Sequence, residues 1–309
     1  MSGGQFLVGT GVTIGVAGIA TFRSGRIDVG DALLNTSIGE LAGDSHTTGD
    51  KNVAVGYAAL TANTTGSSNT AVGREALLVN TTGTKNTAIG NNALDANTTG
   101  GNNISVGSGS LGANTTGDDN TAIGFNALNA NTTASDNTAV GYKALAANTT
   151  GAENVSIGVN SLLVSTTGSY NTAVGYAALD ANTTASHNTA VGQAALSQNT
   201  TGQYNTAVGR LALNANTTAD SNVAVGYNAL LVNTTGTYNV SVGGYSLDAN
   251  TTGSYNTALG QSALGQNTTA DNNTAVGRNA LSANTTGTSN TAVGMNALEV
   301  STTSSENTA

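Results

Sequence analysis

The chain contains no cysteine, no proline and no tryptophan. The absence of cysteine excludes disulfides and thiolate metal sites. Proline usually makes up about 5% of a protein, and without it nothing interrupts a continuous backbone hydrogen-bond ladder. Charged residues are 8% and aromatic residues 4% of the 309 residues, which leaves little for a conventional globular core. The chain must therefore be organised in a different way.

Positive charge is also scarce. The chain has eight lysines and arginines, scattered along its length, and a net charge of −9. No basic stripe could follow phosphates, so nucleic-acid binding is excluded. The two histidines, His46 and His187, are far apart in the sequence, and a catalytic or metal site would need them to converge with carboxylates. We predict that the protein is not an enzyme and has no catalytic residue, metal site or cofactor.

One 17-residue unit fills most of the chain. From Asn52 to Glu306 it occurs in fifteen complete copies without insertion or deletion, and a degenerate copy begins at Asn35. The copy at 171–187 reads NTAVGYAALDANTTASH. A fixed short period indicates one supersecondary unit stacked many times. Each copy keeps β-branched and leucine residues at fixed positions, which a disordered chain would not require, and the unit is too short for a pair of helices.

We number the asparagine of NTAVG as position one. Positions two to four predict a short strand, in which positions two and four share one face and the small residue at position three takes the other. We expect positions two and four to point into the core. Position five is glycine in every copy, which predicts a corner with a positive φ or with no space for a Cβ. The corner glycines include Gly73, Gly158 and Gly175.

Positions eight to eleven predict a second short strand, with the leucine of position nine and the residue of position eleven facing inward. Asn-Thr-Thr-Gly or Asn-Thr-Thr-Ala then predicts a turn. From both strands, the predicted solenoid core includes Val72, Leu77, Val155, Ile157, Leu162, Val174 and Leu179.

Seventeen residues of extended chain with two corners predict one coil of an all-β fold, a parallel β-solenoid (β-roll) of about sixteen coils. At a coil spacing of about 4.8 Å the rod would be about 75 Å long. Like residues then lie above one another, and ladders of asparagine can pair their side-chain amides.

The apolar core of one such coil is thin. One valine, one leucine and several alanines bury few CH₂ groups at about 0.8 kcal/mol each, against a backbone ordering cost of about 1–2 kcal/mol per residue. The small residues at positions three and eight leave a flat face that another chain could approach closely. We therefore expect a homo-oligomer, a trimer about the long axis, with a single-chain solenoid as the alternative.

Residues 1–34 precede the repeat domain of residues 35–309. The run from Gln5 to Phe22 carries no charge, but no positive residue precedes it as in a signal peptide, and it would make a short, glycine-rich membrane helix. Its β-branched residues alternate with others, which favours a strand. We predict a β-rich cap or attachment segment and no membrane span.

Acidic residues recur at position seventeen, where Asp119, Asp136 and Glu153 belong to consecutive copies. Stacked carboxylates would repel one another, and a calcium ion could relieve the repulsion. Calcium also needs several further oxygen ligands, and the sequence places none nearby. A solvated edge is the interpretation that we prefer.

The strings Asn-Thr-Ala-Val-Gly and Asn-Val-Ser-Ile-Gly (154–158) resemble the NSVAIG core motif of YadA-like trimeric adhesin heads. The resemblance implies a left-handed parallel β-roll assembled as a trimer, with Val155 and Ile157 pointing into the roll and Ser156 facing a neighbouring chain. The longer pattern NTAVGYxAL…NTTG is similar to repeats of bacteriophage tail fibres and related virion appendages. The likeness covers about residues 35–309 and is specific to architecture. The period is longer than that of adhesin heads, so the coil must be larger.

A trimeric autotransporter would also need a secretory signal, a heptad stalk and a C-terminal membrane anchor, and we expect none of these here. The resemblance therefore favours a structural fibre subunit of a phage virion appendage, located at the virion surface or outside the cell. A self-assembling extracellular filament or a surface adhesin is the alternative within the structural class.

Two surface features give further hypotheses. Eight of the nine tyrosines lie at positions six or seventeen, and their rings could hold a cell-surface glycan or instead cover the ladder edges. The stacked Thr-Thr pairs resemble the threonine ranks of ice-binding solenoids, but neighbouring threonines point to opposite faces of a strand. Two outward threonines separated by one residue would suit ice better. The candidate surface-binding residues are Tyr170, Tyr176, Tyr238 and Tyr255.

Overall fold

The computed structural model describes residues 33–309. Each coil contributes one strand of three residues, at positions two to four of the repeat. The strands are β1 (Thr36–Ile38), β2 (Val53–Val55), β3 (Thr70–Val72), β4 (Thr87–Ile89), β5 (Ile104–Val106), β6 (Thr121–Ile123), β7 (Thr138–Val140), β8 (Val155–Ile157), β9 (Thr172–Val174), β10 (Thr189–Val191), β11 (Thr206–Val208), β12 (Val223–Val225), β13 (Val240–Val242), β14 (Thr257–Leu259), β15 (Thr274–Val276) and β16 (Thr291–Val293).

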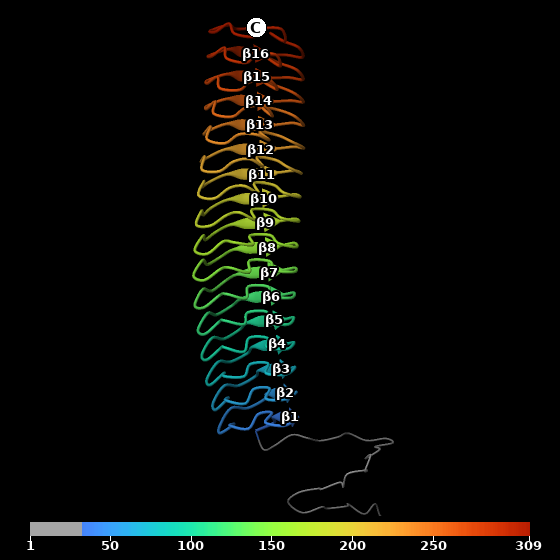
Figure 1. Cartoon of the computed structure of the whole chain (residues 1–309), viewed down its shortest axis with the longest axis vertical. Coiled ribbons are helices and arrows are strands. Elements are labelled where there is room, and N and C mark those ends of the chain that lie inside the picture. Colours follow the sequence, from blue (N-terminus) through green and yellow to red (C-terminus); the bar gives the residue numbers. More distant parts are fainter. Residues whose placement is uncertain (1–32) are drawn as a thin grey trace, which may run out of the picture.

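The strands pair in sequence order from β1 to β16 and form one parallel sheet. The register advances by one repeat at each step, so that Thr172 lies beside Thr189 and Ala173 beside Ala190. Figure 1 shows the coils stacked along the long axis of the molecule, with the strands in one column and the turns on either side. The predicted parallel β-solenoid with 17 residues per coil is confirmed for this part of the chain.

The connection between one strand and the next is a series of turns. The second strand predicted at positions eight to eleven was wrong, because positions seven and nine have left-handed backbone conformations in coil after coil, with φ of +51° at Ala177 and +52° at Leu179. The turns still bond to neighbouring coils: Ala177 N donates to Val159 O at 3.0 Å, and Leu179 N donates to Ala195 O at 3.1 Å. The ladder between coils therefore continues around the whole circumference.

The inner face of each strand is formed by position three. Ala173 is fully buried, whereas Val174 is partly exposed and Ile157 is 40% exposed. The predicted alternation of inner and outer positions along the strand is confirmed. The prediction that positions two and four point into the core was wrong, because position three does so. The predicted core residues that lie on the outer face are Val72, Val155, Ile157 and Val174.

The narrow coil explains this reversal. Inside it, the residues of positions three and eight pack with the leucine of position nine, and two asparagines share the same space. A valine or isoleucine in place of the position-three alanine would not fit between these groups, since close-packed interiors leave no room for extra methyl groups. The predicted core leucines, Leu77, Leu162 and Leu179, are fully buried. Position eleven is not, as Val79 and Val164 are exposed.

Positions three and eight meet inside the coil. In three coils both positions carry serine, and the two hydroxyl oxygens lie close together, 2.6 Å apart for Ser156 and Ser161. Ser156 and Ser161 are fully buried, as are Ala173 and Ala178 of the next coil. The expectation that these small residues form an interface with another chain, and that Ser156 faces a neighbour, was therefore wrong.

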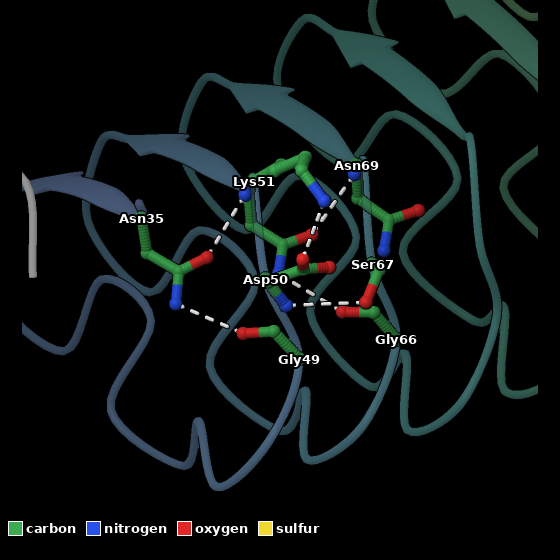
Figure 2. Close-up of polar contacts among 8 residues, drawn as sticks. Asn35, Gly49, Asp50, Lys51, Gly66, Ser67 and Asn69 are labelled. Atoms are coloured by element: carbon green, nitrogen blue, oxygen red, sulfur yellow. Dashed lines mark hydrogen bonds and ion pairs between the residues drawn. The ribbon is translucent and has the colours of Figure 1, made fainter. Parts of the chain in front are cut away.

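The asparagine of position one closes each coil and joins it to the next. In Figure 2, Asn35 Nδ2 donates to Gly49 O at 2.9 Å, which links the beginning of the coil to its end. Asn35 Oδ1 accepts a hydrogen bond from the backbone N of Asn52 in the following coil, also at 2.9 Å. The same pair of contacts recurs along the rod, for example at Asn171 and Asn188.

The asparagine of position twelve forms a second column. Asn80 Nδ2 donates to Asn63 Oδ1 at 2.8 Å in the preceding coil and to Gly83 O at 3.0 Å in its own coil. Gly83 O also accepts from Asn69 Nδ2, the position-one asparagine, at 2.8 Å. In most coils one carbonyl oxygen thus accepts hydrogen bonds from both asparagines. The predicted pairing of asparagine amides along the stack is confirmed.

The corner glycines have φ values that other residues rarely adopt. Gly73, Gly158 and Gly175 have φ of +136°, +137° and +135°. A Cβ at Gly175 would lie 2.6 Å from the carbonyl oxygen of Gly192 in the next coil. The glycine is therefore required both by its backbone conformation and by the close approach of the neighbouring coil.

Of the predicted N-terminal segment, residues 1–34, all but the last two lie outside the described residues. Nothing in residues 33–309 forms a helix able to span a bilayer.

We expect Gly175→Ala to destabilise the rod strongly, by about 3 kcal/mol or more, because strain at positive φ adds to a backbone clash. Thermal unfolding followed by circular dichroism would measure the loss. Gly244→Ala is the matched control, since a Cβ there would have Tyr227 O, at 3.9 Å, as its nearest contact. Equal melting temperatures for the two variants would contradict the proposed role of the corner.

Serine interrupts the position-twelve asparagine column in two coils, and these coils show what the column contributes to stability. Serine stands in this column at Ser165 and Ser301, and in the coil before each of them the asparagine Oδ1, of Asn148 and of Asn284, is buried without a hydrogen-bond partner. Asn182 Nδ2, in the coil after Ser165, reaches the serine Oγ at 3.3 Å. A buried unsatisfied acceptor is destabilising.

We expect Ser165→Asn to raise the stability by about 1 kcal/mol, because the new amide can donate to Asn148 Oδ1 and accept from Asn182. The midpoint of denaturant unfolding would report the gain. Ser165→Ala removes the hydrogen bond that Asn182 makes to the preceding coil and should lower the midpoint. Unchanged midpoints in both variants would contradict a contribution of the position-twelve column to stability.

Candidate binding surfaces

The outer face of the sheet is a continuous strip made of positions two and four. We call it the strand face. Position two is mostly threonine, and position four is valine, isoleucine or leucine in every coil. No charged residue occurs in any of the strands β1 to β16. Many position-four side chains are well exposed, from 36% at Val208 to 61% at Val293.

The size of the strand face is that of a protein interface. Sixteen strands at about 4.8 Å, each of three residues at about 3.3 Å, give a strip of about 75 Å by 10 Å. Its area is on the order of 750 Å², close to the roughly 800 Å² that each partner contributes to a standard interface.

Position seventeen forms a row of exposed side chains beside the strands. Asp119, Asp136 and Glu153 are followed in the next coils by Tyr170 and then His187. Within residues 33–309 no group of three or more histidine, cysteine or acidic side chains could hold a metal ion.

The rings in this row stack on one another. The centroid of His187 lies 4.9 Å from that of Tyr170 and 5.1 Å from that of Tyr204, with nearly parallel planes. Tyr238 and Tyr255 stack in the same way at 5.1 Å. The coil spacing thus brings these rings against one another, and the stacking covers both faces of His187 and one face of each tyrosine.

The candidate tyrosines therefore divide into two kinds. Tyr170, Tyr238 and Tyr255 belong to the stacked row, and Tyr176 lies at position six on the opposite side of β9, where it is 56% exposed. The structure places the four on the surface but does not bring them together at one site.

Position six carries the other aromatic contacts. Phe125 and Tyr142 stack with centroids 5.6 Å apart, and Lys143 lies over the Tyr142 ring. Further along the rod, Arg210 lies over the Tyr227 ring at 5.5 Å, and Tyr245 meets the same ring edge-on at 5.2 Å. Tyr245 stands at position seven, so the tyrosine pattern alone did not point to it.

No protein-family model matches the chain, and no curated protein matches it.

The row of position seventeen yields a prediction about ionisation. A hydrogen bond to the Glu153 carboxylate, with the charge of that group, raises the pKa of Tyr170 above its ordinary value. Glu153→Gln removes the negative charge, so the pKa of Tyr170 should fall toward that of an exposed tyrosine. NMR of ¹³Cζ-labelled tyrosine during an alkaline titration would measure the change. Asp119→Asn is the control, and an equal shift in that variant would contradict a local effect of Glu153.

Proposed function

We propose that this protein is a structural fibre subunit of a phage virion appendage, assembled as a homotrimer about its long axis. The observation that carries the proposal is the strand face, an uncharged strip over sixteen coils with an unbroken aliphatic rank at position four. The similarity of the repeat to those of phage tail fibres supports the same role. On this proposal the protein lies at the virion surface, where its partners are copies of itself and other virion proteins.

The assembly follows from the shape of the strip. Three straight strips that face a common axis would bury the valine and isoleucine rank of each chain against two others. That burial would add to the small apolar interior of each coil, which consists mainly of alanine and one leucine. At about 25 cal/mol per Å² of apolar surface, even partial burial of the strand face is a substantial gain.

The proposed mechanism is mechanical. Backbone hydrogen bonds join each coil to the next around its circumference, and the asparagine columns add side-chain bonds inside. A rod of this kind resists bending and extension, so it would hold a particle at a fixed distance from a host surface. Attachment itself would then depend on exposed side chains of the turns.

We expect the wild-type chain to have a solution mass of about three times its 30.2 kDa on a sizing column with light scattering. Val174→Glu together with Val208→Glu should lower that mass to the monomer, because each trimer would bury six carboxylates near its axis. Circular dichroism should show that the separated chains keep their β structure.

Thr184→Glu is the matched control, since it adds a carboxylate at an exposed position away from the strand face. A wild-type monomer would contradict the trimer, and an unchanged mass in the valine variants would contradict this interface. A distribution that grows with concentration and has no upper limit would instead support the filament.

Ice binding is a second candidate, favoured by one observation. Thr172 and Val174 both point outward from β9, separated by one residue, and this pattern repeats in most coils. A flat rank of threonine methyl and hydroxyl groups is thus present on the strand face. The two functions exclude each other there, because a face buried in a trimer is closed to ice. A monomer that shapes ice crystals and depresses the freezing point would support this alternative.

A further inference from the structure

A hollow of about 420 Å³ opens on the side of the rod between the coils of β13, β14 and β15. Its sides are formed by positions seven, ten and eleven of the repeat, so it shares no residue with the strand face. We call it the Gly265 hollow. Its main lining residues are Tyr245, Asp248, Ser262, Gly265, Gln266 and Ser282.

Two departures from the neighbouring coils create the hollow. Gly265 occupies position ten, where most other coils have leucine or a polar side chain, and it leaves a gap above Asp248. In the next coil position ten is Ser282. Elsewhere an asparagine at position ten reaches back to a position-seven carbonyl, as Asn129 Nδ2 does to Gly109 O at 2.7 Å. Asn214 Nδ2 makes the same contact with Ala194 O at 2.9 Å.

The Ser282 side chain has no amide group with which to form this bridge, so the space beside Ser262 stays open. At Gly112, the other position-ten glycine, Asn129 of the next coil already fills the corresponding place: a Cβ on Gly112 would lie 3.0 Å from its Nδ2. The hollow therefore depends on glycine and serine in consecutive coils.

An aromatic ring forms one side of the hollow. Tyr245 is 41% exposed and is held by an edge-on contact with Tyr227, whose ring in turn lies under the Arg210 guanidinium. A ring fixed in this way offers apolar area at little entropic cost. Unlike Tyr170 and Tyr238, Tyr245 does not belong to a parallel stack of rings.

The remaining side chains are polar except that of Ala249, and they include no cation. Asp248 is about half-buried, and this burial raises the pKa of its carboxyl group above the ordinary value. Ser262 and Ser282 contribute hydroxyls, and Gln266 contributes an amide. A concave site with one aromatic side and a few convergent polar groups suits a small ligand that has both apolar and hydrogen-bonding surface. The carboxylate and the net charge of −9 disfavour an anion.

We propose that the Gly265 hollow binds a neutral hexopyranose unit of a surface glycan. One face of the sugar ring would lie against Tyr245, and its hydroxyl groups would donate to Asp248 and exchange hydrogen bonds with Gln266 and Ser282. The inference deepens the attachment role proposed above and rests on it for the source of the glycan. Sugar binding and trimer assembly use different residues and can be measured separately.

The test is saturation-transfer NMR on the full chain with glucose, galactose, mannose and N-acetylglucosamine, each as the free monosaccharide at millimolar concentration. We expect transfer to at least one of them, and at least tenfold weaker binding in Ser282→Asn, which closes the hollow as Asn129 and Asn214 close theirs. Tyr245→Ala should weaken binding to a similar extent.

Ser289→Asn is the matched control, because it makes the same substitution at an exposed position where the preceding coil already has Asn272. It should bind like the wild type. Absence of transfer to all four sugars, or undiminished binding in Ser282→Asn, would overturn the inference. A monomeric chain that binds sugar only with the hollow open would sustain this inference while the proposed trimer fails.

Discussion

The rest of the structure depends on two buried columns of asparagine. In most coils one carbonyl group, at position fifteen, lies within reach of both asparagines of the coil, as Asn52 and Asn63 meet at Gly66 O. Each asparagine also bonds to the adjacent coil. An amide has both a donor and an acceptor, so the same side chain can close its own coil and join the next. A buried amide without these partners would be costly, so an insertion or deletion within one copy would break the contacts of both columns.

The columns also determine what else the interior can hold. With two amides inside, each coil has space for one leucine and two residues no larger than alanine or serine. The larger β-branched side chains therefore lie outside, on the strand face. Leucine reaches the interior only with a left-handed backbone, at φ of +52° for Leu179, which costs about 1–2 kcal/mol. Hydrogen bonds between coils therefore accompany a small apolar interior, and apolar surface remains available for another molecule.

The sequence allowed the fold class, the period, the corner glycines and the asparagine columns to be predicted, because each follows from invariance among the internal copies. The inner face of the strand could not be found by ranking hydrophobicity, since Val174 is larger than Ala173 and yet lies outside. A second signal was present. In the complete copies serine replaces alanine at positions three and eight together, as in Ser105 with Ser110 and Ser241 with Ser246. The left-handed turns had no comparable signal, because leucine rarely adopts them.

Self-assembly along the rod requires identical coils, whereas binding of one small ligand requires a coil that differs from the others. Sixteen equal coils produce a long uniform face, which suits self-assembly because every coil contributes in the same way. A site for one small ligand must differ from its surroundings, and in a repeat it can arise only where a coil departs from the others. Gly265 and Ser282 are departures at position ten, where substitution disturbs neither the asparagine columns nor the interior. Position ten can therefore vary freely from coil to coil, and recognition can change along the rod while its architecture stays constant.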